Sequence, residues 1–335
     1  MTDATLPPIE QRLRNFIDKE LHPGCNRYHL SQLTGDASTR QYFRYISEAG
    51  EFFILAAYPC PFDPDHFPYR QIYDLFLEIG LPIPRMFAID GKLAIILQED
   101  LGNESLQHRL LTQTVTPQER KRLLCQALDH IVAIQKKGTL ALKPDYEAFR
   151  LAFDKEKLDW ELRFFLRFYL QRYRHLDLQE EKRLMTEFSR LTVELAAYPR
   201  VLCHRDYHVR NLILKDDLVY IIDFQDARWG PPTYDLVSLL KDSIEVNEDE
   251  IDEYLGYYQE AVQSTKGGHF QRQFHLMSIQ RLLKALGTYG YQVEENGNLI
   301  YQQYMEGSLC RTLLSLKAIP EFPYIRSVVE KALSP

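Results

Sequence analysis

Short runs in which hydrophobic and polar residues alternate dominate the first hundred residues of the chain. Alternation of this kind is typical of strands that bury one face, and turn-forming residues separate several of the runs. The sequence Asp90-Gly91-Lys92 predicts a hairpin between the last two of them. The predicted strands are residues 28–33, 41–46, 52–58, 85–90 and 93–98. This part of the chain therefore predicts a small antiparallel sheet.

Two stretches of the same region have the spacing of helices. Apolar residues recur on one face from Ile9 to Leu21, so we expect an amphipathic helix at the start of the chain. Residues 69–76 show the same spacing and end before Gly80. The sheet is thus expected to carry one helix before its first strand and one between its third and fourth strands.

Beyond Glu99 the hydrophobic residues recur mostly at helical spacing. Thr116-Pro117-Gln118-Glu119 is a capping-box sequence with proline at the first helical position, which predicts a helix that runs to about Gln135. Further helices are predicted at residues 158–173, 179–197, 234–241, 250–262, 270–289 and 300–316. Short strands interrupt these helices after residue 200, with a hairpin at Lys215-Asp216-Asp217.

These two patterns predict an α+β protein with two lobes. Residues 1–102 are expected to form a small antiparallel β lobe, and residues 103–335 a larger, mostly helical lobe. The chain has 335 residues, of which 45 % are hydrophobic and 26 % charged. This is long enough and apolar enough to bury two lobes, and it argues against extensive disorder.

Charge and cysteine usage narrow the class of protein. A formal net charge of −7 argues against a nucleic-acid binder, which should show a basic face. No apolar run approaches the roughly 20 residues of a membrane helix, and the first residues do not resemble a signal peptide. The five cysteines are scattered and form no Cys-x-x-Cys pair, which predicts free thiols and no zinc site. We expect a cytoplasmic protein without a nucleic-acid or membrane partner; its oligomeric state is not predicted.

The candidate chemistry lies between Val201 and Asp235. Asn211 follows Asp206 by five residues, and an apolar strand then ends at Asp223. Phosphoryl transfer needs a carboxylate that orients and deprotonates the attacking hydroxyl, and oxygen ligands for the Mg²⁺ that neutralises the phosphates. We predict that Asp206 is this base and that Asn211 and Asp223 are the metal ligands. An isolated aspartate would be interpreted as a turn residue; the combination predicts a kinase that uses ATP and Mg²⁺.

Two residues are predicted to support the loop that carries Asp206. His204 precedes the base by two residues, at the end of a buried strand, where a histidine more often holds a loop by hydrogen bonds than transfers protons. Asp235 lies in the first turn of a predicted helix, where the helix dipole favours an anion. We expect Asp235 to brace the Asp206 loop from below.

Four further residues are candidates for contacts with the substrate. His208 and Arg210 lie in the same loop as the predicted base, and either one could meet phosphate or acceptor. A solvated surface role is an equally open alternative for both. Gln225 and Asp226 directly follow the predicted metal ligand and are candidate substrate contacts.

The segment Gly35-Asp36-Ala37-Ser38-Thr39-Arg40, between the first two predicted strands, is a candidate cover for the phosphates of a nucleotide. Its backbone amides from Gly35 onward, the hydroxyls of Ser38 and Thr39 and the guanidinium of Arg40 all bind anionic oxygens. The segment contains a single glycine, and a plain hairpin turn is the alternative interpretation.

Residues 96–101 lie at the boundary between the two predicted lobes. Glu99 and Leu101 are candidates to offer backbone groups to the edge of an adenine ring. The alternative interpretation is a strand that simply leaves its sheet here.

With these residues in view, the chain resembles the aminoglycoside phosphotransferase and choline kinase group of the protein-kinase-like fold. The pattern His204…Asp206…Asn211…Asp223 is the specific part of the likeness. Within the group it is most similar to bacterial cell-wall sugar kinases, which phosphorylate the anomeric hydroxyl of N-acetylmuramate and N-acetylglucosamine. The stretches that carry this likeness are residues 35–44, 98–102, 204–208, 223–227, 234–240 and 280–287. The resemblance implies an amino sugar as the small-molecule acceptor and extends from about residue 10 to about residue 330.

The chain departs from the pattern of protein kinases in the nucleotide site. Protein kinases hold the phosphates with a lysine on the third strand, but residues 53–58 contain no lysine. The cell-wall sugar kinases are similar in this respect, so another cation must bind the phosphates. Arg40 and Arg44, on the adjacent loop and strand, are the candidates.

Two alternatives to an amino-sugar kinase stay open at this point. An aminoglycoside or choline-type amino-alcohol kinase would need a strongly acidic acceptor pocket that suits a cationic acceptor. A catalytically silent nucleotide-binding regulator is suggested by the absent third-strand lysine. A chain freed from catalysis has no chemical reason to retain Asp206, Asn211 and Asp223 together, which argues against this second alternative.

Overall fold

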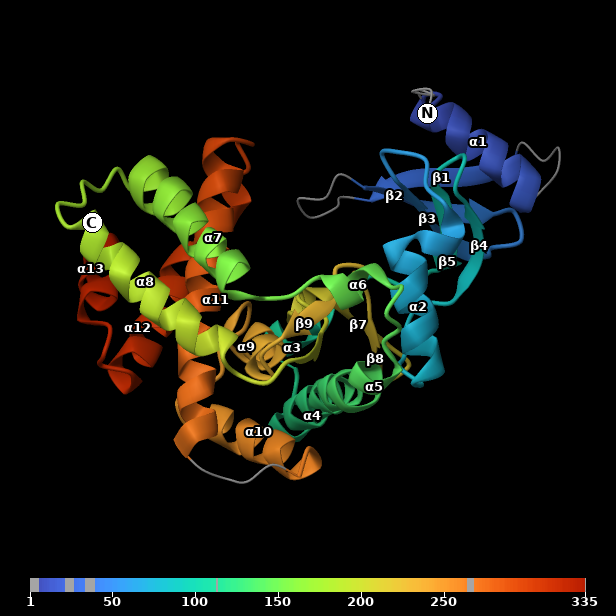
Figure 1. Cartoon of the computed structure of the whole chain (residues 1–335). Coiled ribbons are helices and arrows are strands. Elements are labelled where there is room, and N and C mark those ends of the chain that lie inside the picture. The colour runs from blue at the N-terminus through green and yellow to red at the C-terminus, as the bar shows by residue number, and fades with distance from the viewer. Residues whose placement is uncertain (1–5, 22–26, 34–39, 113, 264–267, 335) are drawn as a thin grey trace.

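The computed structural model describes residues 6–21, 27–33, 40–112, 114–263 and 268–334. Gly35, Ser38 and Thr39 of the predicted phosphate-covering segment lie outside these residues. Figure 1 shows a sheet with two helices on one side of the molecule and a larger group of helices on the other. Short strands and the helix α9 lie between these two parts. The predicted α+β fold with two lobes is confirmed.

The first lobe is built on a five-stranded antiparallel sheet with the strand order β1-β2-β3-β5-β4. Its elements are α1 (Ile9–Glu20), β1 (Tyr28–Leu33), β2 (Gln41–Ser47), β3 (Phe52–Ala57), η1 (Pro64–His66), α2 (Pro68–Glu78), β4 (Met86–Asp90) and β5 (Ile95–Glu99). All five predicted strands and both predicted helices are confirmed, with ends that differ by two residues or fewer. Asp90 closes the predicted hairpin, because its carboxylate accepts hydrogen bonds from the amides of Lys92 and Leu93.

Helix α1 covers one face of this sheet. Leu13, Phe16 and Ile17 are buried against residues that β2, β3 and β5 direct to the same face, among them Tyr45 and Leu55. Burial of this apolar face is worth about 25 cal/mol per Å² and fixes the helix on the sheet. Figure 1 shows α1 lying across the strands at the outer side of the lobe.

Helix α2 connects the opposite side of the sheet with the second lobe. Its residues Ile72 and Phe76 belong to the large core that also contains residues of both lobes. The ring of Phe76 lies 5.4 Å from that of Phe224, which directly follows Asp223. A backbone hydrogen bond of 2.8 Å from Ile221 to Pro82 adds a second connection. The predicted site is therefore anchored to both lobes.

The second lobe is mostly helical. Its helices are α3 (Leu106–Leu111), α4 (Pro117–Ala133), η2 (Ile134–Gly138), α5 (Thr139–Ala141), α6 (Glu147–Arg150), α7 (Lys155–Phe165), η3 (Leu166–Tyr173), α8 (Glu181–Ala196), η4 (Val209–Asn211), α9 (Thr233–Lys241), α10 (Glu248–Ala261), α11 (Gly268–Glu294), η5 (Leu299–Tyr304), α12 (Met305–Ala318) and α13 (Pro323–Leu333). The strands β6 (Val201–Cys203) and β9 (Arg228–Gly230) form one antiparallel pair, and β7 (Leu212–Lys215) and β8 (Leu218–Ile221) form another. The latter is the hairpin predicted at residues 215–217.

Every helix predicted for the second lobe is confirmed, but three of them change geometry along their length. The helix predicted to run to about Gln135 is α-helical to Ala133 and π-helical from Ile134. The predicted helix 158–173 is α-helical to Phe165 and π-helical from Leu166. The predicted helix 300–316 begins as a 3₁₀ segment and is α-helical from Met305. Helices α3, α5, α6 and α13 and the 3₁₀ segment η4 are additional to the prediction.

Only one of the two hydrogen bonds of the predicted capping box at Thr116 forms. The Thr116 hydroxyl accepts a hydrogen bond from the amide of Glu119, as expected. The Glu119 carboxylate instead binds the guanidinium of Arg109 at 2.6 Å. A complete capping box is found at the start of α10, between Asn247 and Glu250.

The long helix α11 contacts α7, η3, α9 and α12 and forms the centre of the second lobe. Two glycines allow its backbone to approach its neighbours closely. A Cβ atom on Gly287 would lie 2.8 Å from backbone atoms of Phe165, and one on Gly290 would lie 2.6 Å from the carbonyl oxygen of Phe168. These contacts fix the distance between α11 and the α7–η3 helix.

None of the helices in the described ranges is long and apolar enough to cross a membrane.

The close packing at Gly290 generates a stability prediction. Gly290→Ala should lower the free energy of unfolding by about 1–3 kcal/mol, because the added methyl group overpacks against backbone that has little room to move. Thermal or urea denaturation followed by circular dichroism measures this change. Gly256→Ala is the matched control, since this helical glycine of α10 has open space around it. The control should be neutral or slightly stabilising, and an equal result for both variants would contradict the close packing.

Candidate active site

Asp206 lies on the loop that follows β6, and the buried carboxylate of Asp235 holds this loop from below. Asp235 accepts hydrogen bonds from the backbone amides of His204 at 2.7 Å and Arg205 at 3.0 Å. Burial raises the pKa of Asp235 to about 7, although both amide hydrogen bonds oppose this shift. Arg205 has a φ of 85°, which a residue with a side chain rarely adopts. The Asp235 contacts thus stabilise a strained turn directly before Asp206.

The side chain of His204 ties the same loop to the end of β8. It is fully buried, and its Nε2 lies 3.1 Å from the carbonyl oxygen of Ile222. Burial lowers the pKa of His204, so the ring is neutral and Nε2–H donates this hydrogen bond. The backbone amide of Ile222 in turn donates to the carbonyl of Asn211. These contacts connect the loop with the residue that precedes Asp223.

Asp206 is partly buried among positive charges. Its carboxylate lies 3.5 Å from Nε of Arg205 and 3.9 Å from Nζ of Lys284, and its side chain is 24 % exposed. Burial alone would raise the pKa of Asp206, but the charges of Arg205 and Lys284 outweigh this effect and hold it well below its usual range. Asp206 is therefore ionised at neutral pH and can accept a hydrogen bond from a hydroxyl group.

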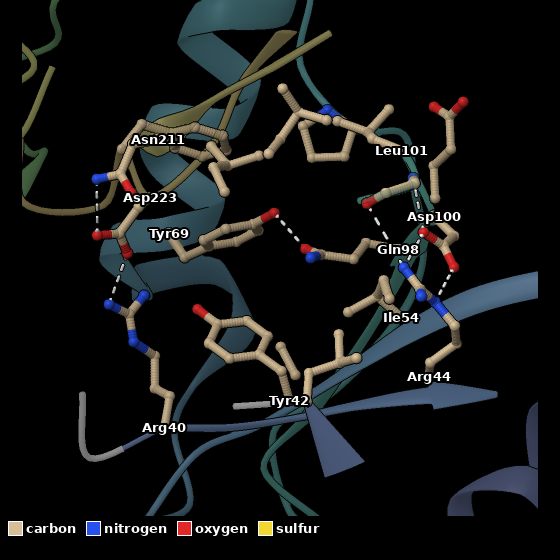
Figure 2. Close-up of a pocket in the computed structure, with 18 of the residues that line it drawn as sticks. Arg40, Tyr42, Arg44, Ile54, Tyr69, Gln98, Asp100, Leu101, Asn211 and Asp223 are labelled. Carbon is tan, nitrogen blue, oxygen red and sulfur yellow. Dashed lines mark hydrogen bonds and ion pairs between the residues drawn. The ribbon is translucent and has the colours of Figure 1, made fainter. Parts of the chain in front are cut away.

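Asn211 and Asp223 lie next to each other (Figure 2). Nδ2 of Asn211 donates to the backbone carbonyl of Asp206 at 3.0 Å and lies 3.4 Å from Oδ2 of Asp223. This orientation leaves the Asn211 side-chain oxygen for another ligand. Asp223 has a φ of 64°, so the strand end turns sharply at this carboxylate.

The donor set of this pair fits Mg²⁺. Amide and carboxylate oxygens are the hard ligands that Mg²⁺ prefers, and it usually takes one or two carboxylates together with phosphates of the substrate. No cluster of three histidine, cysteine, aspartate or glutamate side chains that could hold a metal occurs within the described ranges. Asn211 and Asp223 therefore suit a metal that is shared with phosphate groups.

Arg40 reaches this pair from the first lobe. Its guanidinium binds Oδ1 of Asp223 at 2.7 Å, and the Arg40 side chain is 14 % exposed. The amide of Gln225 donates to the same oxygen at 3.1 Å. Figure 2 shows Arg40, Asp223 and Asn211 together at one end of a pocket. A cation is thus present beside Asp223, although β3 carries no lysine.

This pocket is a cavity of about 330 Å³ between the two lobes. Apolar side chains of β2, β3 and the lobe boundary form its middle, among them Tyr42, Ile54 and Leu101. The Tyr69 hydroxyl donates to Gln98 at 2.9 Å across it. An apolar slot with polar groups at both ends suits a flat ring in its middle and an anionic group at one end.

Arg44 and Glu99 lie at the end of this cavity that is opposite to Arg40. Nη2 of Arg44 binds Oδ1 of Asp100 at 2.9 Å, and the Arg44 Nε lies 2.5 Å from the other carboxylate oxygen. Figure 2 shows this pair beside Leu101, across the pocket from Asp223. The Glu99 carboxylate is bound by Lys215 at 2.5 Å. The structure thus separates the two candidate arginines and places only Arg40 at the Asp223 end.

A second cavity of about 720 Å³ lies on the other side of the Asn211–Asp223 pair and contains Asp206. The residues that line both cavities are Arg40, Tyr58, Tyr69, Arg210, Asn211, Asp223 and Gln225. The two cavities therefore meet at Asn211 and Asp223. A group bound in one can reach a group bound in the other at this junction.

The four predicted substrate contacts all line the second cavity. Asp226 binds the Arg205 guanidinium at 3.0 Å, and Nη2 of Arg210 lies 3.8 Å from the buried carboxylate of Asp242. Burial, followed by the charge of Arg210, lowers the pKa of His208 to about 4. A fully solvated surface role for His208 or Arg210 does not agree with these positions.

Sequence reasoning missed the residues that α7 and α11 contribute to the second cavity. These are Lys157, Trp160, Glu161, Phe164, Arg281, Lys284, Ala285, Thr288 and Tyr289. The resemblance had included residues 280–287, so the sequence contained a signal for α11 but assigned no role to a single side chain. For α7 there was only the helical spacing of apolar residues.

Comparison with known proteins shows the class to which this site belongs. Residues 29–269 match the sequence profile of the phosphotransferase enzyme family. The N-acetylmuramate/N-acetylglucosamine kinase of Neisseria meningitidis is 29 % identical over 303 residues, which are 87 % of this chain and 86 % of that protein. The enzyme of the same name from Pseudomonas aeruginosa is 30 % identical over 286 residues, 81 % of this chain and 79 % of that protein.

The fold has close counterparts among solved structures. The choline kinase LicA from Streptococcus pneumoniae superposes with a TM-score of 0.63 at 15 % identity, over 93 % of this chain and 99 % of that one. At this identity the likeness concerns the fold alone.

The two-lobed fold, with an ionised aspartate beside the junction of two cavities, defines a phosphotransferase of the kinase-like class. The chain belongs to the phosphotransferase enzyme family, whose profile covers most of its length. It is a small-molecule kinase that transfers a phosphoryl group to an alcohol.

The neutral state of His208 generates a pH prediction. The folded-state pKa of about 4 lies below the ordinary value of 6.5, so only the unfolded chain takes up this proton as the pH falls through 6. The stability that depends on a neutral His208 is present above pH 6.5 and is lost as the pH falls toward 4. His208→Gln should therefore reduce the loss of unfolding free energy between pH 7 and pH 5 by about 1–2 kcal/mol.

Urea denaturation at pH 7 and pH 5 measures this difference. His29→Gln is the control, because His29 is exposed on β1; its pH dependence should equal that of the wild type. A pH dependence of His208→Gln that is also equal to the wild type would contradict a neutral, partly buried His208.

Proposed function

We propose that this chain is an ATP- and Mg²⁺-dependent kinase that phosphorylates a sugar hydroxyl, the anomeric hydroxyl of N-acetylmuramate or N-acetylglucosamine. The observation that carries the proposal is the junction of the two cavities. Asn211 and Asp223 line both cavities, and the ionised Asp206 faces only the second one. A nucleotide in the first cavity and an acceptor in the second would thus meet beside a carboxylate that can take a proton.

Asp206 is assigned the role of the base. Its low pKa means that it orients the attacking hydroxyl by accepting a hydrogen bond, and takes the proton late, when transfer to phosphorus has made the hydroxyl acidic. The positive charges of Arg205 and Lys284 disfavour early protonation. Asp235 and His204 act through the loop geometry and touch neither substrate.

The first cavity is assigned to ATP. Its apolar middle would take the adenine ring, with backbone groups near Glu99 and Leu101 at its edge. Arg44 lines the same end, where it is paired with Asp100. At the opposite end Asn211 and Asp223 would hold Mg²⁺, which neutralises phosphate charge when bound. The phosphate-covering role of Gly35, Ser38 and Thr39 stays a prediction.

Arg40 is assigned the role that the third-strand lysine has in protein kinases. It is the arginine of the two candidates that lies beside Asp223, and it lines both cavities. A guanidinium can bind phosphate oxygens with two hydrogen bonds. This replacement removes the main motive for a catalytically silent regulator.

The charge of the second cavity favours a sugar acceptor over an aminoglycoside or choline. The cations that line it are Arg40, Lys157, Arg205, Arg210, Arg281 and Lys284, and the carboxylates are Glu161, Asp206, Asp223, Asp226 and Asp242. A pocket for a polycation should be strongly acidic, whereas cations and carboxylates nearly balance here. Both named relatives carry the name of an N-acetylmuramate/N-acetylglucosamine kinase, which supports the same acceptor class.

One set of assays tests both the class of acceptor and the role of Asp206 as the base. ADP release with MgATP should be seen with N-acetylmuramate or N-acetylglucosamine, and not with aminoglycosides or choline. Asp206→Asn should lower kcat for the sugar by roughly 10²–10⁴-fold, because the loss of a general base has effects of this size. The Kd for ATP should change less than about threefold. Asp74→Asn, which removes an exposed carboxylate of α2, is the matched control.

Several results would contradict this assignment. Turnover of Asp206→Asn near the wild-type level would refute the assignment of Asp206 as the base. ADP release only with an aminoglycoside or choline would show that the acceptor is an amino alcohol and not an amino sugar. The absence of metal-dependent ADP release with every acceptor would favour the catalytically silent regulator.

The role of Arg40 is tested against that of Arg44. Arg40→Met should lower kcat/KM for ATP roughly 10–100-fold, since it removes charge-assisted hydrogen bonds to phosphate. Arg40→Lys should restore part of this loss because it keeps the charge. Arg70→Met, at an exposed ion pair with Asp74, is the control. A greater loss of kcat/KM for ATP with Arg44→Met than with Arg40→Met would reverse the assignment.

A further inference from the structure

Two lysines from different helices enter the acceptor cavity on the side away from the nucleotide. Lys157 lies in the first turn of α7, and Lys284 lies in the middle of α11. Both line the second cavity and neither lines the first. The close backbone contacts of Gly287 and Gly290 hold α11 against the α7–η3 helix. The position of these two lysines is therefore set by the rigid centre of the lobe.

Neither ammonium group has a carboxylate within hydrogen-bond distance. Nζ of Lys157 lies 3.9 Å from Glu161, and Nζ of Lys284 lies 3.9 Å from Asp206. Both distances exceed the usual 2.7–3.2 Å of an N–H···O hydrogen bond. The side chains are only 30 % and 18 % exposed. Among the described residues, the structure thus leaves two partly buried ammonium groups without a hydrogen-bonded anion.

The carboxylates nearby are already occupied by other donors. Oε2 of Glu161 accepts from the buried Gln280 amide at 2.9 Å. Asp242 is bound by Arg281 at 2.6 Å, and Asp226 is bound by Arg205 at 3.0 Å. Among these side chains, none turns toward Lys157 or Lys284 closely enough to neutralise it.

Burial is the largest effect on the pKa values of both lysines, and for Lys284 the charges of Asp206 and Glu161 oppose it. Burial lowers the pKa of Lys157, and the charges of Arg205 and Lys284 lower it further against the opposing effect of Glu161. Burial also lowers the pKa of Lys284. In addition, a cation in the first turn of a helix is disfavoured by the helix dipole. The helix dipole therefore gives no reason for a lysine at this position of α7.

An aromatic surface borders the two lysines. Trp160 is 53 % exposed although it is a large apolar side chain, and it lines the cavity together with Phe164. Nζ of Lys157 lies 4.1 Å from the centre of the Trp160 ring. The rings of Trp160 and Phe164 are stacked at 5.3 Å. An exposed indole at the wall of a polar cavity suits the apolar C–H face of a sugar ring.

We propose that Lys157 and Lys284 bind a carboxylate of the acceptor, and that Trp160 packs against its sugar ring. The inference rests on the proposed function, and it makes a sugar that carries a carboxylate the preferred acceptor of this site. N-acetylmuramate carries such a group on its lactyl ether, and N-acetylglucosamine does not. A neutral acceptor leaves both ammonium groups unpaired, and a cationic acceptor is repelled by them.

The experiment changes the charge on the ligand and on the protein separately. The wild type is assayed with N-acetylmuramate, the methyl ester of its carboxyl group and N-acetylglucosamine. The acid should have a kcat/KM at least roughly tenfold above that of the ester, as expected for charge-assisted hydrogen bonds. This comparison needs no variant, so it holds even if a substitution impairs folding.

The variants Lys157→Met and Lys284→Met should each bring the ratio of kcat/KM for acid and ester toward one. Lys155→Met is the matched control on α7, because Lys155 is half exposed and paired with Asp159; it should leave the ratio unchanged. A purely structural role of either lysine would lower both values equally and keep the ratio.

An acid-to-ester ratio near one in the wild type would overturn the inference, as would an unchanged ratio in both lysine variants. Phosphorylation of none of the three sugars by the wild type would instead refute the proposed function itself.

Discussion

A buried carboxylate that receives two loop amides holds the active-site loop in place. Asp235 binds the backbone of His204 and Arg205, and the second of these residues has an unfavourable positive φ. Without this contact the loop would relax, because strained backbone persists only where its surroundings enforce it. The position of Asp206 beside the junction of the two cavities depends on this interaction.

The second feature of the site is its distribution of charge. Asp206 stays ionised because Arg205 and Lys284 outweigh the effect of its burial. The same cations, with Lys157, give the second cavity a positive side next to Asp206. Arg40 brings a further positive charge from the first lobe to the junction. One set of charges thus keeps Asp206 ionised and, in our proposal, selects the acceptor.

Local sequence patterns predicted much of the first lobe and of the catalytic loop. Hydrophobic and polar residues alternate along the strands of the first lobe, so short windows of sequence predict these strands. Asp206, Asn211 and Asp223 are close in sequence, so their proximity in space was predictable as well; their roles as base and metal ligands stay predictions. The incomplete capping box at Thr116 could not be predicted, because Arg109, which precedes the helix, competes for the Glu119 carboxylate. Two candidate arginines could not be distinguished either, since only the folded sheet places Arg40 beside Asp223.

The acceptor side of the site could not be predicted for a related reason. Lys157 and Lys284 lie on two helices that are far apart in the sequence and come together only through the packing of α11 on α7. Nothing in the local pattern around Lys157 distinguishes it from a solvated lysine on a helix. Its position in a cavity, beside Trp160 and, in the described part of the chain, without a hydrogen-bonded carboxylate, is a property of the tertiary structure.

The most direct measurement is a crystal structure of the wild type with Mg²⁺, a non-hydrolysable ATP analogue and N-acetylmuramate. We expect the terminal phosphate at the junction of the cavities and the anomeric hydroxyl within about 2.6–3.2 Å of an Asp206 carboxylate oxygen. A hydroxyl that faces the terminal phosphate while bound to a different side chain, with Asp206 turned away, would contradict the account.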